Sequence, residues 1–179
     1  MKKILLFTLL VSSLFADAKL YMGVGGGIYN ETYEDTTTSI NNSAALGSFK
    51  IGYGEREAYA IELSFDYIQN NSKLIDTNDG QKYGINIDFV KAFDFDIYVL
   101  PFVKAGFGAG EMKSDLNNGS LNYGSFNLGT GVFLPLSETF DIELAYNYRY
   151  VSYEKINDTI STIPKTHVNI GYIGINARF

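Results

Sequence analysis

The segment AYAIELSFDYI, residues 58–68, alternates apolar and polar side chains over its whole length. Its apolar members stand at every second position: Tyr59, Ile61, Leu63, Phe65 and Tyr67. Successive side chains of a β-strand point to opposite faces, so this segment would have one apolar face and one face carrying Glu62 and Asp66. A helix would scatter the same charges around its circumference. The pattern therefore predicts a strand between two chemically different surroundings.

The same two-residue period recurs along the chain. The clearest repeat is residues 140–150, where Phe140, Ile142 and Leu144 alternate with acidic residues. Weaker versions cover residues 19–29, 44–53, 82–92, 97–109, 123–134 and 167–179. Together they give eight candidate strands of about ten residues, the length that a tilted strand needs to cross a membrane.

The connections between these strands alternate in length. Four are long and polar, at residues 30–43, 69–81, 111–120 and 152–165, and three are short, near residues 54–57, 93–96 and 135–138. Outer-membrane barrels have short periplasmic turns and longer extracellular loops, which is the same asymmetry. We therefore expect surface loops rich in Asn, Thr, Ser and Asp, with Glu31, Glu34 and Asp35 in the first of them.

Residues 1–18, MKKILLFTLLVSSLFADA, have the layout of a secretory signal peptide. Lys2 and Lys3 precede a short apolar run, and small residues follow at Ala16 and Ala18. We expect cleavage after Ala16 or after Ala18, and residues 19–179 form a single domain. The chain has no cysteine, so we expect neither lipoprotein acylation nor disulfides.

The sequence gives little support to nucleic-acid binding, nucleotide binding, or catalysis and metal binding. The formal net charge is -6, and a nucleic-acid partner is not expected because phosphate binding depends on clustered Lys and Arg. Glycine runs at residues 23–27 and 106–110 lack the spacing of nucleotide-binding loops. His167 is the one histidine, so no catalytic residue, cofactor or metal site is predicted.

Periodicity alone does not decide whether the apolar face meets lipid or a soluble core. A lipocalin-like carrier would bury that face and give the same alternation. The membrane alternative is favoured by glycines on the polar face and by aromatic residues near both strand ends, as in interfacial girdles. The girdle residues are Tyr53, Tyr59, Phe93, Phe140 and Phe179 towards the turns, and Tyr67, Tyr83, Phe107, Tyr148 and Tyr150 towards the loops.

The final segment GYIGINARF, residues 171–179, places Ile173, Ile175 and Phe179 in phase at the end of the chain. This ending resembles the C-terminal signal that the barrel-assembly machinery recognises, although Ala177 stands where the family usually has an aromatic residue. The whole mature chain is similar to the small eight-stranded outer-membrane β-barrel family of the OmpA/OmpX type. The resemblance implies an all-β, eight-stranded antiparallel up-and-down transmembrane β-barrel in the bacterial outer membrane.

The same resemblance suggests partners. These are outer-membrane lipid and lipopolysaccharide, the assembly machinery and periplasmic chaperones during biogenesis, and a host or cell-surface ligand at the loops. We expect a monomer.

By alternation, nine charged residues point into the barrel and should form an ionic network, because charges in a low-dielectric enclosure need partners. They are Lys50, Glu62, Asp66, Asp88, Lys104, Asp141, Glu143, Arg149 and Arg178. Counting from the turns predicts a layer with Lys50 opposite Glu62, and a second layer nearer the loops that contains Lys104 and Arg149. A filled structural interior is favoured over an ion pathway, since side chains fill an eight-stranded barrel.

Four functions remain open. The first is a structural or surface-interaction role, in adhesion or envelope integrity, through the loops. The alternative is a narrow ion or small-solute pore. A soluble carrier and a lipid A-modifying enzyme are less favoured, the latter because such barrel enzymes use a His with a nearby Ser and the residues after His167 lack that serine.

Overall fold

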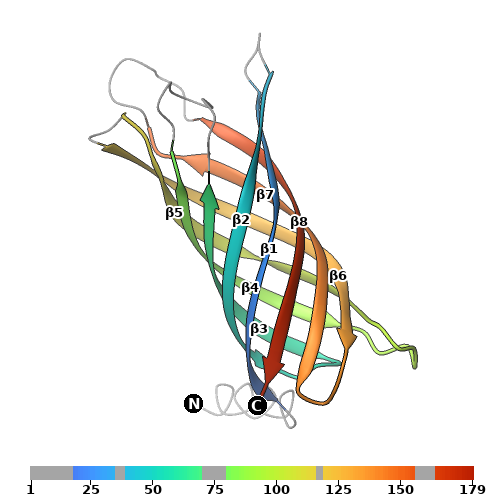
Figure 1. Cartoon of the computed structure of the whole chain (residues 1–179). Helices are drawn as coiled ribbons and strands as arrows, with labels where there is room; N and C mark the ends of the chain where they lie inside the picture. The colour runs from blue at the N-terminus through green and yellow to red at the C-terminus, as the bar shows by residue number, and fades with distance from the viewer. Residues whose placement is uncertain (1–17, 35–38, 70–79, 116–118, 156–163) are drawn as a thin grey trace, which may run out of the picture.

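The computed structural model describes residues 18–34, 39–69, 80–115, 119–155 and 164–179, and the expected signal peptide lies outside them apart from Ala18. Each strand pairs antiparallel with the next, and β8 pairs with β1 to close a barrel (Figure 1). The strands are β1 (Lys19–Glu34), β2 (Ser39–Gly54), β3 (Tyr59–Gln69), β4 (Lys82–Ala92), β5 (Leu100–Lys113), β6 (Ser120–Pro135), β7 (Phe140–Tyr153) and β8 (Lys165–Arg178). Within these ranges no helix is long and apolar enough to cross a membrane.

The strands are longer than the sequence pattern predicted. β1, β2 and β6 each contain 16 residues, and only β3 and β4, with 11 each, match the expected length. Much of the predicted first loop is therefore strand, and the β1–β2 hairpin extends well beyond the barrel wall in Figure 1. Outward side chains there are polar and bond across the hairpin, Ser43 to Asn30 at 2.6 Å and Thr32 to Asn41 at 2.8 Å. Polar residues on both faces remove the alternation from which strand ends were predicted.

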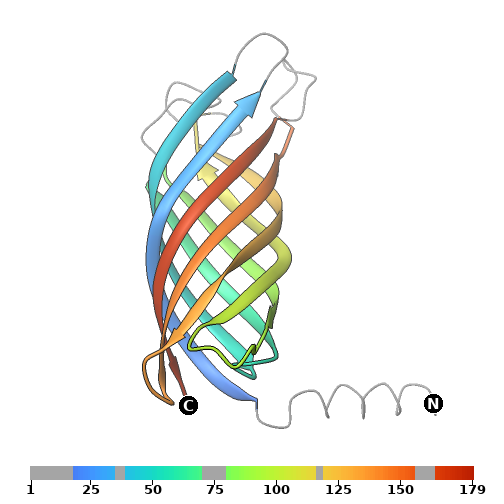
Figure 2. The same cartoon turned by 90° about the vertical axis from the view of Figure 1, so that its right-hand side faces the viewer.

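The strands wind around the barrel axis (Figure 2). Following paired residues from Met22 once around the barrel, through all eight strands, returns to β1 at Thr32, ten residues further on. This stagger means that directly paired residues lie at different depths, with a climb of a little over one residue per strand. Depth along the axis must therefore be compared after allowing for the climb.

The apolar rows face outward. Phe65, Leu144 and Ile175, from three different strands, are 41%, 41% and 48% exposed, while Glu62 and Glu143 between such rows are buried. A soluble carrier would need the reverse arrangement, so the orientation contradicts that alternative. The prediction of an antiparallel barrel with outward apolar rows is confirmed.

The predicted girdle residues all lie on the outer surface, at two depths. Tyr53, Tyr59 and Phe140 lie near the end that holds the short connections 55–58, 93–99 and 136–139, called the turn end. Phe107 is at the centre of β5, but allowing for the climb places it level with Tyr148 and Tyr67, nearer the opposite, loop end. Tyr83 and Tyr150 lie slightly above them. Two aromatic belts thus bracket an apolar band.

Inside the barrel, aromatic rings lie over glycines of neighbouring strands. Gly131 pairs with Phe102, and a Cβ at Gly131 would lie 2.7 Å from Cζ of that ring and against the carbonyl oxygen of Leu144. The Tyr172 hydroxyl of β8 similarly occupies the space beside Gly25 of β1. Glycine at these positions therefore lets large inward rings fit within a narrow barrel.

We expect Gly131→Ala to lower the free energy of unfolding by about 1–3 kcal/mol, because the new methyl group meets backbone and ring atoms that have little room to move. Urea unfolding in phospholipid vesicles measures this. The matched control is Gly47→Ala, where an added Cβ meets nothing within 4 Å. Equal effects for the two substitutions would contradict the close packing described for Gly131.

Candidate functional site: the barrel interior and its two ends

The centre of the barrel is occupied by two lysines and two glutamates. Lys50 Nζ lies 3.3 Å from Glu62 and 2.7 Å from Glu143. Lys104 Nζ lies 3.4 Å from Glu62 and 3.9 Å from Glu143. The residues come from β2, β3, β5 and β7, so this four-membered cluster ties both sides of the barrel together across its axis.

A second group lies nearer the loops. Arg149 Nη2 contacts Asp66 Oδ2 at 2.6 Å, and Asn86 donates to Asp66 at 3.0 Å. Asp88, which pairs directly with Glu62 and lies close to the depth of the central cluster, accepts a 3.4 Å hydrogen bond from Asn127. Lys104 was expected in this layer, but the structure places it with Glu62 and Glu143. The prediction counted positions from the turns and ignored the climb of paired residues, which brings Lys104 level with Lys50.

The turn end of the interior holds a third cluster. Arg178 Nε lies 2.7 Å from Asp141, and the Arg56 guanidinium contacts the same carboxylate at 2.8 Å. Arg178 also stacks over the Tyr21 ring. Arg56 was not predicted in this cluster because it belongs to a turn, and alternation assigns no direction to turn residues.

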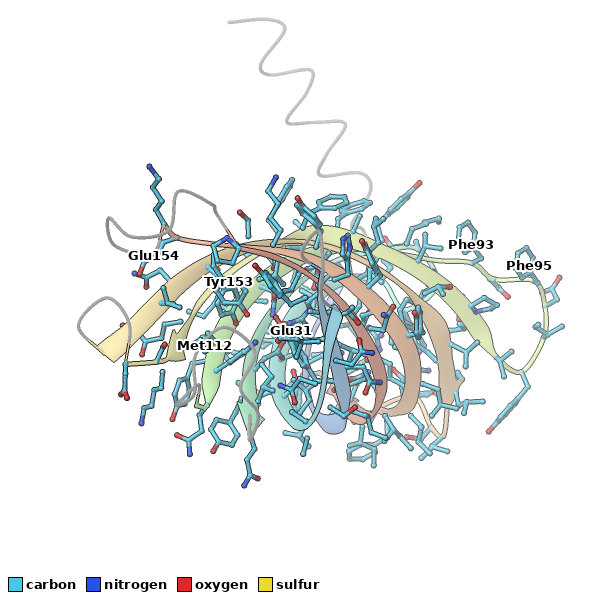
Figure 3. All side chains as sticks on the ribbon, turned by 90° about the horizontal axis from the view of Figure 1, so that it is seen from above. Glu31, Phe93, Phe95, Met112, Tyr153 and Glu154 are labelled. Carbon is cyan, nitrogen blue, oxygen red and sulfur yellow. The ribbon has the colours of Figure 1, made fainter. Side chains whose placement is uncertain are left out.

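At the loop end, the Glu31 carboxylate pairs with the Lys82 ammonium, and neither side chain is exposed. Glu31 also accepts hydrogen bonds from Tyr153 at 2.7 Å and Thr166 at 2.6 Å. Figure 3, the view from above, labels Glu31 and Tyr153. The expectation that Glu31 belongs to an acidic surface loop is therefore wrong. Extending the inward odd-numbered positions of β1 from Tyr21 and Tyr29 would have identified it.

The interior is also more apolar than predicted. One cluster of buried side chains lies at the loop half, with Tyr29, Leu46, Ile68, Met112, Leu121, Val151, Tyr153, Val168, Ile170 and Tyr172 among its members. Another lies at the turn end and consists of Tyr21, Ala60, Val90, Ala92, Leu100, Phe102 and Phe133. The ionic centre is thus enclosed between two apolar layers. The sequence predicted the ionic network alone, and the two apolar layers that enclose it were not predicted.

Little space remains between the layers. A cavity of about 20 Å³ lies between Lys50, Asp66 and Arg149, which is room for about one water molecule. Among the described residues, no three His, Cys, Asp or Glu side chains are grouped so that they could hold a metal ion. The charged side chains of the interior are therefore held in fixed positions, because little free space remains around them.

His167 lies on the outer wall rather than in the interior. Its Nδ1 is 2.6 Å from the Tyr148 hydroxyl, and its ring packs against Tyr150 at 5.5 Å between centroids. The neighbouring outward residue Asn169 accepts a hydrogen bond from Tyr146. This places His167 in the loop-side aromatic belt.

The C-terminal strand completes the wall. Ile173 and Ile175 point outward and are 58% and 48% exposed, and Phe179 donates its N–H to the carbonyl of Leu20 at 2.9 Å. Three residues of the expected assembly signal thus form one apolar edge beside the start of β1.

A family model described as outer membrane protein β-barrel domain matches residues 4–179. The chain belongs to this family. Outer-membrane β-barrel is therefore its class, and the pattern-based resemblance is confirmed. No curated protein sequence matches the chain.

Solved outer-membrane barrels have the same fold. The match to Neisserial surface protein A covers 90% of this chain and 99% of that protein's chain, with 16% sequence identity and a TM-score of 0.69. The match to the N-terminal barrel of OprF from Pseudomonas aeruginosa covers 90% of this chain and 97% of that barrel's chain, with 15% sequence identity and a TM-score of 0.55. A third match is Ail, the attachment invasion locus protein of Yersinia pestis, in a crystal structure with the heparin analogue sucrose octasulfate. This match covers 90% of this chain and 99% of that of Ail, with 18% sequence identity and a TM-score of 0.54. At these identities the likeness concerns the fold alone.

Proposed function

We propose that the chain is a closed barrel of the bacterial outer membrane that serves as a structural and surface-interaction protein, in adhesion or envelope integrity. It reaches that membrane with a cleaved signal peptide at residues 1–18 and assembles as a monomer with the help of periplasmic chaperones and the barrel-assembly machinery. Its partners are outer-membrane lipid, lipopolysaccharide and a host or cell-surface molecule. We propose neither a catalytic residue nor a cofactor for it.

The observation that carries this proposal is the filled interior. Ion pairs at three depths alternate with two apolar clusters, and the cavity among the central charges has a volume of only about 20 Å³. A hydrated ion would have to displace several buried, mutually paired side chains to pass. Interaction through the outer surface is therefore better supported than transport through the barrel.

The loop end offers surface suited to contact. The β1–β2 hairpin presents hydrogen-bonding side chains on its outer face, including Asn30, Thr32, Asn41 and Ser43. Asn122 and Glu154 form a similar pair between β6 and the end of β7, at 3.0 Å. Ail is named for attachment, and its crystal structure contains a heparin analogue. A surface role of that kind fits the polar outer face of the β1–β2 hairpin.

The test replaces the connections at residues 35–38, 70–79, 116–118 and 156–163, one at a time, with Gly-Ser sequence of equal length. Cell adhesion and serum survival are then measured, and we expect at least one replacement to reduce one of them. Replacing Ser137 and Glu138 at the turn end is the matched control. Each variant must still shift on a gel when boiled, as folded barrels do. Unchanged behaviour for all four replacements would contradict the surface role.

Planar-bilayer recording separates this function from the pore alternative. We expect the purified barrel to give no resolved current, because Lys50 and Lys104 hold Glu62 and Glu143 across the axis. A steady current that is lost on Lys104→Met or Glu62→Gln would establish a pore. A variant of the exposed Lys113 serves as the control for added or lost charge outside the lumen.

A further inference from the structure

One carboxylate in the barrel interior is not paired with a cation. The central cluster and the group above it contain three cationic side chains and four carboxylates, and the ion pairs involve Glu62, Glu143 and Asp66. Among the residues that the structure describes, Asp88 takes part in no ion pair, although it is only 3% exposed. Its 3.4 Å hydrogen bond from Asn127 brings an amide and no charge. A buried carboxylate needs a compensating positive charge.

A second buried oxygen close to Asp88 also lacks a partner. Asn147 is 7% exposed, and within the described part of the chain its Oδ1 accepts no hydrogen bond. Asp88 and Asn147 both border the interior cavity of about 20 Å³. Allowing for the climb of the strands, they lie at similar depths. An uncompensated charge and an unused acceptor therefore share one small space.

Two glycines determine where these oxygens lie. Asp88 Oδ1 lies over Gly106 of β5, against the position that a Cβ would take there, and Asn147 Oδ1 lies over Gly129 of β6 in the same way. Gly106 pairs with Asn127, two residues from Gly129, so the two glycines are diagonal neighbours about 7–8 Å apart. A hard cation with oxygen ligands at about 2.4 Å on either side spans about 5 Å. A separation of this size suits one ion between the two oxygens.

The chemistry around the cavity favours a monovalent cation as its occupant. A water molecule would donate to Asn147 but would leave Asp88 uncompensated, and a proton would neutralise Asp88 but bring nothing to Asn147. A divalent ion is usually held by several carboxylates, and the other carboxylates of both groups are already paired with Lys or Arg. Lys104 and Arg149 also border the cavity, but each contacts a carboxylate of its own.

We propose that the barrel interior binds one alkali cation of the size of sodium between the Asp88 carboxylate and the Asn147 amide oxygen. The hydroxyl oxygens of Ser64 and Tyr172, which border the same cavity, complete its oxygen ligands. The ion balances the charge of the two groups and joins β4 to β7 across the two strands between them. This site is structural and does not depend on any role of the loops.

Urea unfolding in phospholipid vesicles, with sodium chloride replacing choline chloride at constant total salt, tests the site, because choline is too large for the cavity. For about 0.5 M sodium and a dissociation constant of about 50 mM, the ratio of folded to unfolded protein should rise about tenfold. Asp88→Asn should abolish this rise. In choline alone it should be at least as stable as the unchanged protein, because no uncompensated charge remains. Asn147→Ala should reduce the rise.

The matched control is Glu57→Gln, which removes an exposed carboxylate of the β2–β3 turn and should keep the full sodium effect. Equal stability in sodium and choline would overturn the proposal, and so would a sodium effect that persists in Asp88→Asn. A gain in stability on acidification that Asp88→Asn removes, with no sodium effect, would assign a proton to Asp88 instead. The gel shift on boiling checks that each variant folds. These measurements use purified protein, so their failure would leave the surface function untouched.

Discussion

Lys82→Met is expected to lower the free energy of unfolding by about 3–5 kcal/mol, because it leaves the Glu31 carboxylate buried without its cation. The Lys82 ammonium contacts Glu31 and also donates to the Tyr153 hydroxyl at 2.7 Å. Methionine fills a similar volume, so the loss reports on charge more than on packing. Urea unfolding in vesicles measures the change, and the gel shift on boiling reports the folded fraction.

Two further variants identify the cause. Lys113→Met removes an exposed lysine of β5 and should change stability little. Glu31→Gln combined with Lys82→Met removes both charges, and it should recover most of the stability lost in the single variant. If the double variant were as unstable as the sum of its parts, the ion pair would not be the source of the effect.

The fold followed from the sequence because an eight-stranded membrane barrel repeats one simple rule along every strand. Phe65 and Ile175 face lipid, and Glu62 and Asp66 face inward, as their positions in the alternation require. The rule depends only on the two-residue period of a strand, so it holds without knowledge of tertiary contacts. The orientation of each predicted inward charge could be read in this way.

The partners of those charges could not be read with the same success. Lys104 meets Glu62 and Glu143 because paired residues climb ten residues in one circuit of the barrel, and no local pattern states that number. The Glu31–Lys82 pair was missed for a different reason. Glu31 lies where the outer face of β1 becomes polar, so the sequence there resembles a loop although the strand continues, and Lys82 is the first residue of its predicted strand.

The apolar layers inside the barrel depend on pairings between distant residues. Phe102 stacks on Phe133 with centroids 4.4 Å apart, and Phe102 covers Gly131 on the adjacent strand. A large inward ring is tolerated only where the opposing residue is small. The sequence shows both the rings and the glycines, but the register that brings them together is fixed by closure of the whole sheet.

The central cluster gives the second large effect. Lys50→Met is expected to lower the free energy of unfolding by about 3 kcal/mol, towards the low end for a broken buried ion pair, because Lys104 still lies near both carboxylates. Lys50 is 2% exposed and makes the shorter contacts, 3.3 Å to Glu62 and 2.7 Å to Glu143. Unfolding in urea, in the same vesicles, measures the loss.

Lys104→Met provides the comparison within one cluster. Its side chain is 10% exposed and its contacts are 3.4 Å and 3.9 Å, so its removal should cost less than removal of Lys50. Removing both lysines leaves Glu62 and Glu143 without a cation at the centre, and the combined loss should exceed the sum of the single losses because each lysine partly replaces the other. Additive losses would mean that the two lysines act independently, and the four residues would then be two separate ion pairs and not one cluster that closes the barrel.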